Sequence, residues 1–228
     1  QFVSFNEKPE KVFSWRVGES SWLTSDSVSA ILSSSDGKTL IGTYGGGLNI
    51  VSLSSDTERY SVGNNRVIML YQTADKAFWI GTESGLFSFD INSKDIAPVP
   101  FKQKEMLERV NPIVWDMVET DEGELWLATM HHGLFLWNRK ESKQKIISPF
   151  SSTVEADGFF NIVYALEIDN DGFIWASTDN GLVRIDPKTR IIELFSQQHG
   201  LQLSEFDFGV SHKDLKGYVY FGGSNGYT

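Results

Sequence analysis

One phrase, repeated along the chain, limits what this sequence can fold into more than any other feature. The copy "DGFIWASTDNGLVRID" runs from Asp171 to Asp186. Earlier copies read "DGKTLIGTYGGGLNIV" from Asp36, "DKAFWIGTESGLFSFD" from Asp75 and "DEGELWLATMHHGLFLWN" from Asp121, and a shorter "KGYVYFGGSNGYT" begins at Lys216. Aligned on one large apolar position, successive copies lie 39, 47, 49 and 45 residues apart. A period of this length is typical of propellers, solenoids and other repeat arrays.

The residues within a copy indicate strands rather than helices. "IVYALEID" (Ile162–Asp169) is rich in β-branched and aromatic residues. The following "NDG" is a hairpin-turn signal, because Asn, Asp and Gly tolerate positive φ. "FIWAST", the turn "DNG", the alternating "LVRID", the breaker "PKT" and "RIIELFS" complete the unit. Each unit is therefore predicted to be an antiparallel meander of four strands.

Radial repetition of such meanders predicts an all-β fold, a β-propeller of about five four-stranded blades. In that fold the large residue at the aligned position should fill the gap between adjacent sheets. These structural positions are Leu40, Trp79, Trp126, Trp175 and Tyr220. The glycine that precedes a leucine in each complete unit should supply the positive φ of the second turn. These glycines are Gly47, Gly85, Gly133 and Gly181.

The unit boundaries divide one propeller segment, residues 1–228, into six parts. We expect outer strands of an incomplete blade over 1–27, blades over 28–66 and 163–207, blades with insertions over 67–113 and 114–162, and a partial blade over 208–228. Either the N-terminal strands complete the last blade and close a five-bladed ring, or the segment is a fragment of a larger propeller. The abrupt end at "SNGYT" favours the fragment. One helix-like stretch, "KQKEMLERV" (Lys102–Val110), lies between units.

Composition excludes several classes of function. The 228 residues carry a formal net charge of −10, which argues against nucleic acid and against anionic lipid as partners. No apolar run of about 18 residues is present, so this segment itself should make no membrane contact. The chain contains no cysteine, which removes every cysteine-based metal site or nucleophile.

Variation between the copies indicates a candidate ligand site. In a meander whose first strand is innermost, the turns between strands 2 and 3 share one face with the connections between blades. The insertions 96–112 and 149–161 fall on that face, and insertions gathered on one face often mark the binding face of a repeat protein. The predicted ligand-binding rim comprises Tyr44, Arg66, Glu83, Asn111, His131, His132, Asn161, Asp179, Asn180 and Asn225.

Ordinary structural roles compete with chemical ones at these positions. His131 and His132 could hold a metal or act as a base, but no other histidine lies at ligand spacing, so a polar turn is favoured. Glu83 and Asp179 belong to separate turns, which disfavours an acid–base pair. The repeated tryptophans could stack on sugar rings, but their fixed position favours core packing. We predict no catalytic residue, no metal and no cofactor in this segment.

The unit "D-x-x-G-x-[IL]-W-[IL]-[GA]-T-x-x-G-L-x-x-[IF]-D" resembles the two-component regulator propeller repeat. "DGFIWASTDNGLVRID", "KAFWIGTESGLFSFD" and "ELWLATMHHGLFLWN" match that repeat well, and "HGLQLSEFDFGVSHKDLKGYVYFGGSNGYT" is similar to the last repeat of such sensors. Leu40 in place of Trp, and Lys76 in place of Gly, depart from the pattern within single blades.

The resemblance implies the periplasmic sensor region of a transmembrane signalling protein. Its output domain, a histidine kinase or a GGDEF-type diguanylate cyclase, would lie outside this chain. The implied partners are an unknown small molecule, oligosaccharide or peptide, and a second copy of the chain in a possible homodimer. Two alternatives stay open. One is a protein-interaction scaffold of the WD-repeat type, although the "GH…WD" pairing is missing; the other is a propeller lyase, for which His131 or His132 would be the catalytic candidate.

Overall fold

The fold is built of consecutive antiparallel sheets. The computed structural model describes residues 2–5, 9–13, 23–34, 36–52, 57–99, 112–138, 143–147, 162–201 and 206–228. Four sheets have four strands each, a fifth has three, and every strand pairs with its neighbour along the chain. The only helical element of the described residues is the 3-10 turn η2 (Gln197–His199). The prediction of an all-β propeller made of meanders is confirmed.

The strands of each sheet follow directly in sequence. The first sheet holds β3 (Val28–Ser33), β4 (Thr39–Thr43), β5 (Gly47–Val51) and β6 (Thr57–Tyr60). The second holds β7 (Val67–Gln72), β8 (Phe78–Thr82), β9 (Gly85–Phe89) and β10 (Ile96–Pro98). The third holds β11 (Val114–Glu119), β12 (Glu124–Thr129), β13 (Gly133–Asn138) and β14 (Lys143–Ile147). The fourth holds β15 (Val163–Ile168), β16 (Ile174–Thr178), β17 (Gly181–Ile185) and β18 (Ile192–Phe195), and the fifth β19 (Phe206–Lys213), β20 (Val219–Gly223) and β21 (Gly226–Tyr227).

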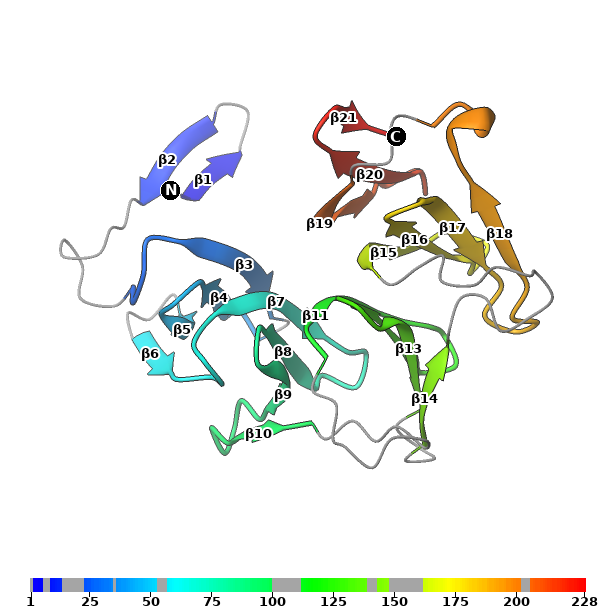
Figure 1. Ribbon diagram of the computed structural model, residues 1–228. Coiled ribbons are helices and arrows are strands. Elements are labelled where there is room, and N and C mark those ends of the chain that lie inside the picture. The colour runs from blue at the N-terminus through cyan, green and yellow to red at the C-terminus, as the bar shows by residue number, and fades with distance from the viewer. Residues whose placement is uncertain are drawn as a thin grey trace.

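The sheets are arranged as an arc around a common centre (Figure 1). The first strand of each sheet is innermost, and β3, β7, β11, β15 and β19 lie side by side in that order. Because the strands of a meander alternate in direction, every turn between strands 2 and 3 opens on the same face of the arc. The topology therefore gathers the most variable turns of the repeat at one mouth.

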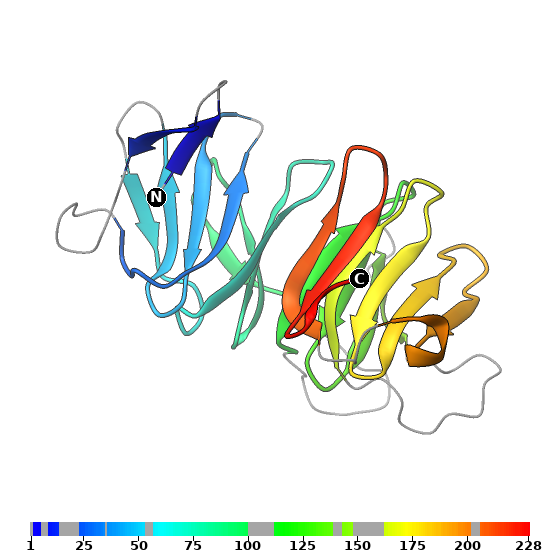
Figure 2. The ribbon, with the colours of Figure 1, turned by 90° about the horizontal axis from the view of Figure 1, so that it is seen from above.

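The N-terminal strands β1 (Phe2–Phe5) and β2 (Pro9–Phe13) form a two-stranded sheet of their own. In both views this hairpin stands on the side of the first sheet, away from the fifth (Figures 1 and 2). Among the described strands, β21 pairs with β20 alone, so these strands do not supply a fourth strand to the fifth sheet. The helix-like stretch at Lys102–Val110 and the insertion 149–161 lie outside the described residues, as does the insertion 96–112 between residues 100 and 111.

The large residue of the repeat lies between neighbouring sheets. Trp126 of β12 is fully buried in a cluster with Val163 and Ile174 of the fourth sheet. Trp79 of β8 shares a cluster with Val114 and Met117 of the third sheet. Leu40 and Trp175 belong to the clusters that join the first sheet to the second and the fourth to the fifth. These four apolar layers hold the arc together, whereas Tyr220 of the last sheet is only half-buried.

In each of the first four sheets, a small residue lies two positions after the large residue of the repeat, where the inner strand of the next sheet comes close. A Cβ placed on Gly42 would lie 2.4 Å from Cγ1 of Val67, and one on Gly81 would lie 2.5 Å from the carbonyl oxygen of Val114. The third and fourth sheets use Ala128 and Ser177 at this position. The "[GA]-T" of the repeat is therefore a spacing device, because a larger side chain there would push adjacent sheets apart.

The threonine of the repeat closes the turn between strands 2 and 3. Its Oγ1 donates a hydrogen bond to the carbonyl oxygen of the turn glycine in four sheets. The distances are 3.0 Å for Thr43–Gly47, 3.1 Å for Thr82–Gly85, 2.6 Å for Thr129–Gly133 and 2.9 Å for Thr178–Gly181. All four threonines are buried, and all four glycines have positive φ. The turn is thus held by its two ends, while the residues between them are left free to vary.

Gly181 gives a direct test of this turn. Its φ is +131°, and an added Cβ would lie 2.2 Å from the carbonyl oxygen of Phe195. Gly172 is the matched control, with φ +85° and no atom within 4 Å of its Cβ position. We expect Gly172→Ala to cost roughly 1–2 kcal/mol through backbone strain alone. Gly181→Ala should cost at least about twice as much in guanidinium unfolding, and equal losses would contradict the close approach.

Candidate functional site

A groove of about 690 Å³ lies at the centre of the arc, between the inner strands. We call it the central groove. Its walls come from β3, β7, β11 and β19, and its mouth from the turns between strands 2 and 3 of the first three sheets. The residues that line it are Ser29, Ala30, Ile31, Tyr44, Val67, Ile68, Met69, Leu70, Glu83, Ile113, Trp115, Asp116, Met130, Phe208 and Gly209.

A β-bulge interrupts each of the inner strands β3, β7 and β11 where it lines this groove. The pairing register shifts between Val28 and Ala30, between Val67 and Met69, and between Val114 and Asp116. Two residues on a bulged strand oppose one on its partner, so neighbours that would otherwise face opposite ways come to the same side. The residues at these bulges that line the groove are Ser29, Ala30, Ile68, Met69, Trp115 and Asp116, and Met69 also packs between the second and third sheets.

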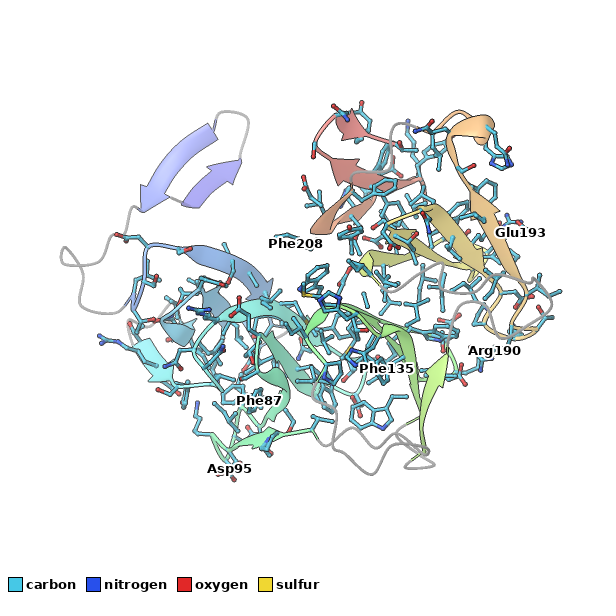
Figure 3. All side chains as sticks on the ribbon, viewed as in Figure 1. Phe87, Asp95, Phe135, Arg190, Glu193 and Phe208 are labelled. Carbon is cyan, nitrogen blue, oxygen red and sulfur yellow. The ribbon has the colours of Figure 1, made fainter. Side chains whose placement is uncertain are left out.

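Trp115 is the centre of an aromatic wall. Its ring stacks on Tyr164 of β15, with centroids 5.7 Å apart and an interplanar angle of 18°. Phe208 of β19 lies on the groove side, 5.1 Å from the Trp115 centroid. Figure 3 shows Phe208 on the inner side of β19, facing the centre of the arc, and its side chain is 61% exposed. A large aromatic ring left open in a hollow is a typical feature of ligand pockets.

Asp116 places a carboxylate on the floor of the groove. Its Oδ2 accepts the backbone N–H of Leu166 at 2.8 Å, and its Oδ1 accepts that of Met117 at 2.8 Å. Burial, and to a smaller extent the nearby negative charge of Glu167, raise the pKa of Asp116 to about 7, although the two N–H bonds act the other way. Asp116 therefore changes its charge near neutral pH and links the third sheet to the fourth.

Three predicted rim residues meet at the mouth. The Tyr44 hydroxyl donates to Oε1 of Glu83. An Nη of Arg66 donates to Oε2 of the same carboxylate at 2.7 Å. The Arg66 guanidinium also lies 5.3 Å from the centroid of the Tyr44 ring. These bonds lower the pKa of Glu83, the hydrogen bond from Tyr44 first and that from Arg66 second, and they raise the pKa of Tyr44. Glu83 is thus an ionised, fully occupied acceptor.

The other predicted rim residues do not join this group. His131 and His132 are exposed in their turn, where Nδ1 of His132 lies 3.1 Å from the carbonyl oxygen of Met130. Asp179 lies in the fourth sheet, near enough to raise the pKa of Tyr164, so it does not pair with Glu83. Asn180 and Asn225 are exposed in the turns of the fourth and fifth sheets. Asn111 and Asn161 lie outside the described residues.

The described residues contain no cluster of metal-ligating side chains. Among them no three His, Asp or Glu side chains gather as a metal site would require. None of the helices in the described ranges is long and apolar enough to cross a bilayer. The arrangement at the central groove can bind and orient a ligand through aromatic faces, one titrating carboxylate and a polar mouth.

Three residues of the groove were missed by sequence reasoning: Trp115, Asp116 and Phe208. The signal was present in the four segments "VSAIL", "VIMLY", "VWDMV" and "VYALE", in which a constant valine precedes two variable residues. Alternation along a regular strand places those two residues on opposite faces. The bulge changes this alternation locally, and no pattern within a single copy predicts it.

Comparison with known proteins agrees with the fold. A family model described as "Two component regulator propeller" matches residues 157–180, which confirms the resemblance of the repeat. Histidine kinase P4 of Formosa agariphila is 26% identical over 199 residues, and the match covers 81% of this chain and 14% of that kinase. The chain therefore spans about one seventh of the length of this relative.

Solved structures are similar in fold at lower sequence identity. The extracellular domain of a putative hybrid two component system from B. thetaiotaomicron superposes with a TM-score of 0.72 at 16% identity, covering 86% of this chain and 28% of that chain. A second such domain from the same organism gives 0.63 at 19% identity, covering 97% and 35%. Virginiamycin B lyase from Staphylococcus aureus gives 0.66 at 13% identity, covering 89% and 69%.

The titration of Asp116 predicts a pH-dependent stability. Because the pKa of Asp116 is raised from 3.8 in the unfolded chain to about 7 in the folded chain, the folded state favours the protonated form. That contribution is complete below about pH 4 and is lost as the pH rises to about 7. As the pH rises from about 4 to about 7, the Asp116→Asn variant should therefore become progressively more stable than the parent chain. Urea unfolding at several pH values measures this difference in unfolding free energy. Asp121→Asn, an exposed carboxylate of the same sheet, should show no such trend; a flat difference for Asp116→Asn would contradict the shift.

Proposed function

We propose that this chain is the extracytoplasmic ligand-recognition part of a bacterial two-component signalling protein. The observation that carries the proposal is the central groove, where bulged inner strands and variable turns converge around Trp115 and Asp116. The match to a histidine kinase, 26% identical in sequence, covers 81% of this chain and supports a role in signal transduction. The location that follows from this function is the periplasm.

We further propose that the output domain lies outside this chain and is a histidine kinase. The histidine kinase relative supports this output over a diguanylate cyclase, which the repeat alone would equally allow. The propeller segment itself then has no catalytic role. Its task is to convert occupancy of the central groove into a change that the output domain can detect.

Transmission would occur by movement of whole units rather than within a sheet. The four buried clusters between sheets resist internal deformation, because close-packed interiors transmit strain instead of absorbing it. A ligand that contacts β3, β7, β11 and β19 together would shift the balance between two arrangements of paired protomers. A homodimer is the assembly that fits such rigid-body signalling.

The two alternative functions have less support from the described residues. The lyase alternative is supported only by similarity of fold. Its candidate residues, His131 and His132, are exposed in a turn and belong to no cluster of metal-ligating groups among the described residues. The scaffold alternative is favoured by exposed aromatic residues of the fifth sheet, such as Tyr218 and Tyr227. A scaffold would not need a recessed groove with a titrating carboxylate.

Autophosphorylation of the longer protein in membrane vesicles tests the proposal. The protein is assayed with compounds that first stabilise this chain in a thermal-shift screen of amines, amino acids, peptides, sugars and divalent metals. We expect at least one stabilising compound to change the phosphorylation rate, and Trp115→Ala to raise the concentration needed by at least about tenfold. Tyr218→Ala, an exposed aromatic outside the groove, should leave the response unchanged.

Two results would contradict the proposal. One is that none of the stabilising compounds changes phosphorylation at saturation, which would separate binding from signalling. The other is equal sensitivity of the Trp115→Ala and Tyr218→Ala proteins, which would place recognition outside the central groove. The thermal unfolding of both variants without ligand is recorded in parallel, so that a loss of folding is recognised as such.

A further inference from the structure

The charges that line the central groove do not balance. Its lining includes two carboxylates, Glu83 and Asp116, and no lysine or arginine. At the mouth, Glu83 is already paired with Arg66 at 2.7 Å. On the floor, the hydrogen bonds of Asp116 come from the backbone N–H groups of Leu166 and Met117. Among the described residues, no basic side chain forms an ion pair with Asp116. The floor of the groove therefore has an excess of negative charge.

The walls around Asp116 are apolar and aromatic. Ile31, Ile68 and Met130 supply aliphatic surface, while Trp115 and Phe208 supply ring faces. The face of an aromatic ring attracts cations through its quadrupole, and tryptophan does so most strongly. A carboxylate and two aromatic side chains in the lining of one groove are the combination that favours a positively charged group with an apolar body.

We propose that the central groove binds an organic cation, a protonated amine or guanidinium attached to an apolar or aromatic group. Asp116 is the counter-ion, and Trp115 and Phe208 contact the cation and its apolar body. This inference rests on the proposed function, because it names the class of ligand that the same groove recognises.

Other ligand charges fit the groove less well. An anion would bring a second negative charge close to Asp116 and to Glu167 on the adjacent β15, and like charges at short range destabilise one another. A neutral ligand would displace water from the Asp116 carboxylate without replacing its interactions, which carries a desolvation cost. A cation replaces that water with a direct charge-assisted hydrogen bond.

The titration of Asp116 makes binding of a cation depend on pH. The charged and titratable groups that act on Asp116 are Glu167 of β15 and, through its own interaction with Asp116, Tyr71 of β7. His212 and Lys213 of β19 act on Glu167 in turn. Because burial raises the pKa of Asp116 to about 7, the ionised form that attracts a cation predominates only above that pH. Affinity for an amine should therefore rise from about pH 5 to about pH 8.

Three probes of similar shape separate the effect of charge from that of the ring: phenethylamine, phenethyl alcohol and phenylacetate. Each is titrated into the 228-residue chain by calorimetry, and the indole N–H of Trp115 is followed by NMR after assignment with Trp115→Phe. We expect phenethylamine to bind at least about tenfold more tightly than phenethyl alcohol at about pH 8 and to shift the Trp115 signal. Phenylacetate should bind more weakly than either.

The carboxylate is tested with a matched pair of variants. Asp116→Asn should abolish the preference for the amine and its pH dependence, whereas Asp121→Asn, an exposed carboxylate at the opposite end of β11, should retain both. Equal binding of amine and alcohol with a Trp115 shift would overturn the cation inference and leave the groove as a ligand site. Absence of a Trp115 shift with all three probes would overturn the inference as well, and the phosphorylation assay then judges the proposed function independently.

Discussion

The structure depends on the apolar contact between one sheet and the next. A four-stranded meander has two faces, and a sheet of this size leaves apolar surface exposed unless a neighbour covers it. In this chain the aligned residue of the repeat, Trp126 in the third sheet, is buried against the inner strand of the following sheet. Two positions after the large residue of a unit comes a small one, for example Gly42 in the first sheet or Gly81 in the second. This small residue allows the inner strand of the next sheet to come within van der Waals distance. One large and one small residue per unit therefore set both the strength and the spacing of the arc.

Around this contact, local hydrogen bonds fix the geometry of each unit. The buried threonine at the end of strand 2 bonds to the turn glycine, which closes the turn within its own sheet. Additional polar links join adjacent sheets at their rims. Arg190 of the fourth sheet, labelled in Figure 3, donates to Glu124 of the third at 2.8 Å, and its guanidinium lies 5.1 Å from the centroid of the Trp126 ring. Such links orient the sheets, while the apolar layers hold them together.

Much of the fold could be predicted from the sequence, because repetition averages out the uncertainty of a single copy. Five aligned phrases identified the strands, the turns and the propeller. They also allowed Tyr44, Arg66 and Glu83 to be placed at one mouth, where the structure joins them through one carboxylate. The turn of the third sheet contributes Met130 to the groove lining, whereas His131 and His132 are exposed, and their part in ligand binding stays a prediction.

The floor of the groove could not be predicted, for a physical reason. Trp115 and Asp116 are adjacent, and alternation along a regular strand would send one of them into the sheet interface. A bulge depends on the pairing of two strands and on the approach of a third, which no local pattern encodes. Phe208 was missed for a related reason, because its place opposite Trp115 depends on how many sheets separate β11 from β19.

The self-contained turn has an evolutionary consequence. Because threonine and glycine close it from within, the residues between them can differ from one copy to the next. The chain has used that freedom to place Tyr44 in one copy, Glu83 in the next and Met130 in a third, all at the same mouth. Duplication of one unit thus provides a stable frame together with a set of positions open to selection. New recognition properties can then arise by point mutation, without a search for a new fold.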